Sequence, residues 1–92
     1  MLKVRYSTQF KKDFKLAKKR GLPLGELKDV LETLAAEKPL NEKYCDHTLR
    51  GKYVSFRECH IRPNWLLIYR ISKEELVLIA QRTGTHSDLF DE

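Results

Sequence analysis

The sequence predicts an α+β domain in which a helical hairpin covers one face of an antiparallel sheet, in the order β-α-α-β-β-β. Three observations lead to this expectation. Two early stretches repeat apolar residues at helical spacing, and the chain after residue 52 changes to strand-like runs with short connections. Helices early and strands late are typical of α+β proteins. The 92 residues, 41% of them hydrophobic, suffice for one core, so residues 1–92 are expected to form a single domain.

The chain is expected to begin with a strand and a helix. Residues 2–6 alternate apolar with basic side chains, which indicates a short strand with one buried face. Ser7 or Thr8 can cap a helix that runs to about residue 20, where Gly21 ends it. The apolar residues of this helix recur at helical spacing: Phe10, Phe14 and Ala17.

A second amphipathic helix is predicted over residues 24–37, introduced by Pro23 and Gly25. Its apolar stripe consists of Leu24, Leu27, Val30, Leu31, Leu34 and Ala35. Two such helices joined by a few residues form a hairpin. Residues 38–48 are expected to be a polar loop.

Three strands are predicted in the remaining chain, at residues 53–61, 65–71 and 75–82. The connections between them, around 62–64 and 72–73, are so short that neighbouring strands must be antiparallel. The helices cover only one face of such a sheet, so the other face must be solvated or used. A single β-bulge would reverse which residues point to that face, and the assignment is left open.

The charge distribution favours a polyanionic partner. Lys and Arg outnumber Asp and Glu by 18 to 13, for a formal net charge of +5. The basic residues cluster in the first helix: Lys11, Lys12, Lys15, Lys18, Lys19 and Arg20. A solvated helix face is the simpler interpretation of this cluster when it is considered alone.

The two cysteines and the N-terminus favour a cytoplasmic protein with reduced thiols. Cys45 and Cys59 form no Cys-x-x-Cys motif, which gives no sign of a zinc site or a disulfide framework, although one disulfide is left open. The N-terminal residues lack the apolar region of a signal peptide, and no apolar run approaches ~20 residues. No membrane association and no cofactor are expected.

Three histidines are the candidate groups for chemistry: His47, His60 and His86. No two of them have the short spacing of zinc ligand pairs, so no metal is predicted. RNA can be cut without a metal if one group takes the 2′-OH proton, another protonates the 5′-oxygen, and cations hold the phosphate charge. Histidine suits both proton roles and arginine the third. By composition alone, surface histidines and arginines remain the simpler interpretation.

Three segments resemble the RelE/ParE superfamily, specifically its YafQ branch of bacterial type II toxins. They are DHTLRG (46–51), FRECHIRPNWLLIYRI (56–71) and RTGTHSDLF (82–90). The resemblance spans nearly the whole chain. It implies a ribosome-dependent mRNA endonuclease that cleaves the codon in the A site and leaves a 2′,3′-cyclic phosphate. It also implies a cognate DinJ- or RelB-like antitoxin, whose complex with the toxin binds operator DNA and represses its own operon.

The resemblance also assigns roles to residues of this chain. His47 becomes the candidate general base, His60 assists or orients the 2′-OH, and His86 becomes the candidate general acid. These labels remain exchangeable among the three histidines. Arg82 would stabilise the phosphorane, and Phe90 would support the displaced mRNA base. Thr83 and Gly84 would let the chain turn, so that His86 comes to lie beside the arginine.

Further RNA contacts follow from the same resemblance. Trp65 matches the Trp after the strand turn, where packing is favoured over stacking. Asn64 stands where a YafQ toxin has aspartate, and it could orient a histidine by hydrogen bond but not act as a base. Arg57 is expected to pair with an acid such as Glu58. The resemblance makes contact with 16S ribosomal RNA the preferred interpretation of Lys11, Lys12, Lys15, Lys18 and Lys19.

Two other classes of function are consistent with parts of the sequence. A ParE-like toxin would bind and inhibit DNA gyrase on the same fold without nuclease activity, but it would not need the set of three histidines. A DNA-binding regulator would use residues 8–37 as a helix-turn-helix. The helix that would enter the major groove is acidic, which argues against this class: Glu26, Asp29, Glu32 and Glu37. An inactive member of the toxin family is a further alternative.

Overall fold

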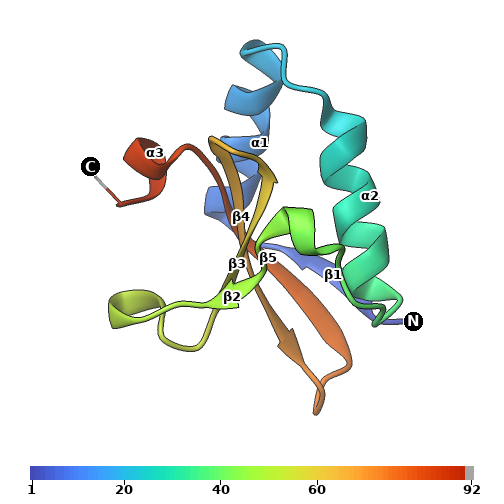
Figure 1. Cartoon of the computed structure of the whole chain (residues 1–92). Helices are drawn as coiled ribbons and strands as arrows, with labels where there is room; N and C mark the ends of the chain where they lie inside the picture. The colour runs from blue at the N-terminus through green and yellow to red at the C-terminus, as the bar shows by residue number, and fades with distance from the viewer. Residues whose placement is uncertain (91–92) are drawn as a thin grey trace.

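The computed structural model describes residues 1–90 and confirms the predicted fold class (Figure 1). A sheet and a helical hairpin make up most of the chain, and the order of the predicted elements is as expected. The elements are β1 (Lys3–Tyr6), α1 (Thr8–Lys19), α2 (Leu24–Ala35), β2 (His47–Thr48), β3 (Arg57–Arg62), β4 (Trp65–Ser72), β5 (Val77–Gly84) and α3 (His86–Phe90), with short 3₁₀ turns η1 (Glu42–Tyr44) and η2 (Gly51–Tyr53).

The five strands form one sheet in the order β1-β5-β4-β3-β2. The meander from β2 to β5 is antiparallel, as predicted, but β1 pairs with β5 in parallel, with Lys3 opposite Val77 and Tyr6 opposite Ala80. The expectation of a purely antiparallel sheet was therefore wrong at this edge. Short connections fix the direction of strands that follow one another, whereas β1 is separated from β5 by both helices and three strands.

The helices α1 and α2 lie on the same side of the sheet (Figure 1). The α1 helix begins where Ser7 Oγ accepts a hydrogen bond from the backbone N–H of Phe10 at 2.9 Å, a standard N-cap. The core between the helices and the sheet includes Phe10, Ala17, Leu27, Val30, Leu34, Cys59, Trp65, Leu67, Tyr69, Leu78 and Ala80. Within residues 1–90, no helix is long and apolar enough to cross a membrane.

An open apolar groove of about 820 Å³ is lined by residues of α1, α2 and β1. Phe14, one of the apolar residues at helical spacing in the first helix, lines this groove and is 36% exposed. Lys11 and Lys15 lie at the same groove. The buried stripe of α1 is instead formed by Phe10, Asp13 and Ala17.

The sheet face away from the hairpin carries a second, smaller apolar cluster. Leu66, Ile68 and Leu89 form its buried part. Leu49, Tyr53, Phe56 and Phe90 pack against them. The segment before β3 and the unpredicted helix α3 therefore cover part of this face. The remainder is available for a site.

A β-bulge in β5 decides which way Arg82 points. Ala80 pairs with Tyr69 and Arg82 pairs with the preceding residue Ile68, so Gln81 is the extra residue. Ala80 belongs to the core under the hairpin, and strict alternation would turn Arg82 to that side as well. Because of the bulge, Arg82 shares a face with Ile68, away from the hairpin.

Both cysteines are free thiols, which settles the disulfide that the sequence left open. Cys45 is exposed, whereas Cys59 is buried in the core. Burial raises the pKa of the Cys59 thiol to about 12, with a smaller contribution from the Asp46 carboxylate. At neutral pH, Cys59 is therefore an apolar packing residue and not a nucleophile.

Candidate active site

The three histidines converge on one buried carboxylate, that of Glu58. Oε1 of Glu58 lies 3.1 Å from Nε2 of His60 and 3.9 Å from Nε2 of His86. Oε2 of the same residue lies 3.7 Å from Nε2 of His47. The Glu58 side chain is 5% exposed, against 51%, 23% and 43% for His47, His60 and His86. The histidines thus line an accessible surface above a shielded negative charge.

The sheet register brings these residues together. His47 on β2 pairs directly with Glu58 on β3, and His60 follows two residues later on the same face. His60 pairs with Leu66, and Leu66 pairs with Gly84, the last residue of β5. The chain turns there into α3, whose first residue is His86. The His60 ring lies next to both others, with ring centroids 6.2 Å from His47 and 5.7 Å from His86.

His47 has a defined tautomer when it is neutral. Its Nδ1 lies 2.8 Å from the carbonyl oxygen of Cys45. A carbonyl can only accept, so Nδ1 carries the proton and donates it. The lone pair is then on Nε2, which faces the cluster, and this arrangement suits a general base.

Glu58 is the site residue that sequence reasoning missed. Alternation along β3 correctly placed Glu58 and His60 on one face, but Glu58 was expected to pair with Arg57. In the structure Arg57 binds Asp46 instead, with both contacts at 3.2 Å. Tyr69 donates to the same Asp46 carboxylate at 2.6 Å. The available signal was that His60 follows Glu58 by two residues in the strand, so that both side chains point to the same face.

Phe90 lies beside the histidines. Its ring centroid is 6.2 Å from that of His86 and 6.0 Å from that of Tyr53. Tyr53 in turn meets Phe56 edge to face at 6.1 Å, and the Arg70 guanidinium lies over the Phe56 ring at 5.7 Å. An aromatic wall therefore borders the histidine cluster, where an unstacked base could rest.

The structure does not support RNA binding by Trp65, and it places Asn64 elsewhere than expected. Trp65 is 2% exposed in the core under the hairpin, and its Nε1 donates to Thr83 Oγ1 at 2.9 Å. A buried indole has no face for a base, so Trp65 packs in the core, as the sequence analysis favoured, and is not available for stacking on RNA. Asn64 lines a cavity of about 250 Å³ between α1 and the β3–β4 turn, together with Arg20 and Asp88. This cavity lies on the α1 side of the sheet.

The five candidate lysines of α1 are all exposed: Lys11, Lys12, Lys15, Lys18 and Lys19. They occupy the helix positions that Phe10, Asp13 and Ala17 leave to solvent. Their charges are therefore free of the core and available to a polyanion.

Glu58, His60 and His86 also have the chemistry of a metal site. One ligand atom from each lies within 4.8 Å of the others. Two imidazoles and a carboxylate suit a divalent transition metal. The spacing argument missed this set because it considered only ligands close together in the sequence. A bound ion would act as a Lewis acid there. It would also occupy the lone pairs of His60 and His86, which proton transfer would otherwise need.

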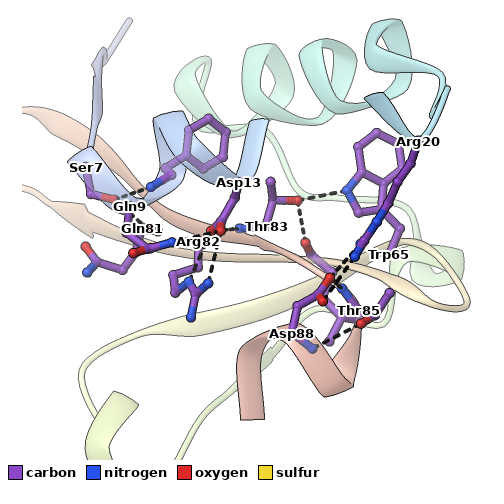
Figure 2. Close-up of polar contacts among 12 residues, drawn as sticks. Ser7, Gln9, Asp13, Arg20, Trp65, Gln81, Arg82, Thr83, Thr85 and Asp88 are labelled. Atoms are coloured by element: carbon purple, nitrogen blue, oxygen red, sulfur yellow. Dashed lines mark hydrogen bonds and ion pairs between the residues drawn. The ribbon is translucent and has the colours of Figure 1, made fainter. Parts of the chain in front are cut away.

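The helix that carries His86 is anchored at its first turn. Thr85 N donates to Asp88 Oδ2 at 3.0 Å and Asp88 N donates to Thr85 Oγ1 at 3.1 Å, a reciprocal cap. Gly84 is needed for this approach, since a Cβ there would lie 2.9 Å from Asp88 Oδ2. Arg20 reaches across from α1 and donates to Asp88 at 2.6 Å (Figure 2).

The Arg20–Asp88 pair should contribute stability that depends on pH. Hydrogen bonding to Arg20 lowers the pKa of Asp88 from 3.8 to about 2. A lowered pKa means that the ionised carboxylate stabilises the fold above about pH 4, and that this contribution is lost as pH falls towards 2. For this partly exposed pair we expect Arg20→Ala to lower the free energy of unfolding by about 1 kcal/mol at pH 7.

Urea unfolding followed by Trp65 fluorescence would measure this difference at pH 7 and at steps between about pH 4 and 2. Lys19→Ala, the exposed neighbour on α1, is the matched control and should have little effect. A difference between wild type and Arg20→Ala that stays constant through the acid range would contradict the assignment to Asp88.

Comparison with known proteins finds relatives over nearly the whole chain. Residues 2–91 match the family model described as the bacterial toxin of type II toxin-antitoxin system, YafQ. The chain is 40% identical over 88 residues to the mRNA interferase toxin YafQ of Escherichia coli K12, covering 95% of this chain and 94% of that protein.

Solved structures extend the agreement to three dimensions. The metal-bound toxin from Helicobacter pylori is 47% identical, with a TM-score of 0.93 over 98% of this chain and all of that one. YafQ in the E. coli DinJ–YafQ complex is 38% identical, with a TM-score of 0.88 over 98% of this chain and 99% of that one. The chain therefore belongs to the YafQ family of bacterial toxins of type II toxin–antitoxin systems.

Proposed function

We propose that this chain is an mRNA interferase, an endoribonuclease that cleaves mRNA on the ribosome and so inhibits translation. The observation that carries the proposal is the convergence of His47, His60 and His86 on the buried carboxylate of Glu58. Acid–base cleavage of RNA needs two proton-transfer groups close together, and here three imidazoles share one anion. A gyrase inhibitor of the same fold would need no such cluster.

The reaction begins with removal of the proton from the 2′-OH of the nucleotide before the scissile bond. His47 suits this step, because its Nε2 carries the lone pair while Nδ1 donates to Cys45. The 2′-oxygen attacks phosphorus, the bond to the 5′-oxygen breaks, and His86 supplies the proton that this oxygen takes up. The products are a 2′,3′-cyclic phosphate and a free 5′-OH.

The order of the rings fits this division of roles. His60 lies next to both His47 and His86, so it can orient the 2′-OH between the base and the acid. Glu58 stabilises the positive charge that an imidazole gains when it takes a proton, and its burial limits screening of that interaction. Arg82 would hold the charge on the phosphorane, and Phe90 would support the displaced base.

The ribosome is the proposed setting of the reaction. The exposed lysines of α1 offer phosphate contacts to 16S ribosomal RNA, which would hold the toxin in the A site. Ribosomes and mRNA place the activity in the bacterial cytoplasm, where Cys45 and Cys59 would stay reduced. A DinJ- or RelB-like antitoxin is the proposed inhibitor, and their complex would bind the operator. A relative has been solved with DinJ.

Primer extension in a cell-free translation reaction tests this proposal. We expect the wild-type protein to produce in-frame cuts in a translated mRNA and none in the same mRNA without ribosomes. Intact mRNA with undisturbed translation would contradict the proposal. A gyrase supercoiling assay would then decide for or against the ParE-like alternative.

A further inference from the structure

Asp13 is a buried carboxylate in the middle of the basic helix α1. It lies on the buried stripe between Phe10 and Ala17 and is 7% exposed. Burying a carboxylate is costly unless its oxygens accept hydrogen bonds or it is paired with a cation. The mechanism described above gives this residue no role, so its partners are informative.

The partners of Asp13 are concentrated on Arg82 and its neighbour. Oδ2 accepts from Arg82 Nε at 3.0 Å and from the backbone N–H of Thr83 at 3.1 Å. Oδ1 accepts from Arg82 Nη2 at 3.0 Å and from Gln9 Nε2 at 3.1 Å. The contact with Arg82 is thus bidentate, the strong and directional form of an arginine–carboxylate pair (Figure 2).

The topology explains why α1 reaches this part of β5. The ladder between β1 and β5 ends at the Tyr6–Ala80 pair. Beyond that pair, side chains from α1 and the residue before it bind the β5 backbone in place of a strand. Ser7 Oγ donates to the carbonyl of Gln81 at 2.6 Å, and Asp13 accepts from Thr83 N. Arg82 is the bulge-shifted residue between these two contacts.

The Arg82 guanidinium is held at the histidine face of the sheet. Glu58 and Arg82 both pair with Ile68, so the three side chains form a row across β3, β4 and β5 on that face. Tyr53 packs on the same face of the sheet. Asp13 raises the pKa of the guanidinium further above its usual value, so its charge is constant at all working pH values.

We propose that Asp13 is a positioning residue of the nuclease. It fixes the Arg82 guanidinium in one orientation, in which the N–H groups that Asp13 does not bind face the cleaved phosphate. This inference rests on the proposed function. A guanidinium has five N–H donors, and Asp13 takes the Nε–H and one on Nη2. The remaining donors are the other N–H of Nη2 and the two of Nη1, which point along the adjacent edges. An arginine fixed beforehand stabilises a developing phosphorane without reorganisation during the reaction.

The proposal predicts a split between rate and binding. In Asp13→Asn the side chain can still accept from Thr83 N–H, but it loses the charge and the second acceptor for Arg82. Arg82 keeps its charge and can still attract RNA. We therefore expect single-turnover cleavage on programmed ribosomes to fall at least about 10-fold at saturating toxin, with the half-saturating toxin concentration unchanged.

A double-mutant cycle separates this role from a purely structural one. If Asp13 acts through Arg82, adding Asp13→Asn to Arg82→Ala should reduce the rate no further. Asp29→Asn, an exposed acid on α2, is the matched control and should cleave like wild type. Thermal unfolding of every variant would confirm that assays run on folded protein. Asp13→Glu restores the charge and provides a second, foldable variant, which should recover part of the rate.

Three outcomes would overturn the proposal. The first is that Asp13→Asn cleaves at the wild-type rate while Arg82→Ala is slow. The second is that Arg82→Ala itself cleaves at the wild-type rate. The third is that the losses of rate in the two single variants add fully in the double mutant. Absence of cleavage by the wild-type protein would instead overturn the proposed function, and the inference with it. The wild-type arm of the same experiment therefore distinguishes the two failures.

Discussion

Replacing His86 with alanine is expected to reduce ribosome-dependent cleavage by about 100- to 10,000-fold, the usual contribution of a general acid. His86 is the first residue of α3, its side chain is 43% exposed, and its Nε2 lies 3.9 Å from Glu58. An exposed position means that the fold should tolerate the change. The measurement is single-turnover cleavage on programmed ribosomes, with the melting temperature determined in parallel.

His86→Gln is the matched comparison for this loss. Glutamine keeps a polar group near Glu58 but cannot transfer a proton, so we expect it to be as slow as alanine. If the glutamine variant cleaved at close to the wild-type rate, His86 would be a positioning residue. The acid would then have to be sought in His47 or His60.

Replacing Glu58 with glutamine should have an effect of similar size, about 100-fold or more. The amide has nearly the same shape, but it cannot stabilise the charge on a protonated histidine, and Glu58 serves three of them. The fold itself should be as stable or slightly more so, because a buried charge has been removed. Loss of cleavage without loss of stability would identify a chemical role and not a packing role.

The control for Glu58 is Glu37→Gln, which removes an equal charge from an exposed position and should leave the rate unchanged. Both variants should be assayed with and without a chelator, because Glu58, His60 and His86 can also hold a divalent metal. A Glu58→Gln enzyme that cleaves like wild type in chelator would show that the carboxylate has no part in proton transfer.

Much of the fold could be predicted because its main signals are local. The stripes of α1 and α2 and the short turns around β4 follow from residue spacing, and the fold class is confirmed. The two missed elements, β2 and α3, contain two and five residues, which is too short for a period to be recognised. The parallel β1–β5 pair depends on residues more than seventy positions apart.

The site was harder to predict for the same reason. Sequence resemblance pointed to the three histidines, and the structure brings them together. Glu58 gains His47 and His86 as neighbours only when β2 pairs with β3 and α3 follows β5, and neither element was predicted. The direction of Arg82 depends on one extra residue, Gln81, which no alternation rule reveals. Trp65 belongs to the family motif yet packs in the core, where its indole N–H donates to Thr83 Oγ1.

The pairing of β1 with β5 also fixes when during its synthesis the enzyme can become active. The first strand and α1 bind residues of β5, through Lys3 with Val77 and Asp13 with Thr83. None of these contacts can form until the C-terminal strand has left the ribosome that makes it, and contacts so distant in sequence are slow to form. A nascent chain whose β5 has not yet emerged therefore lacks the contacts that fix Arg82, and its site is not assembled.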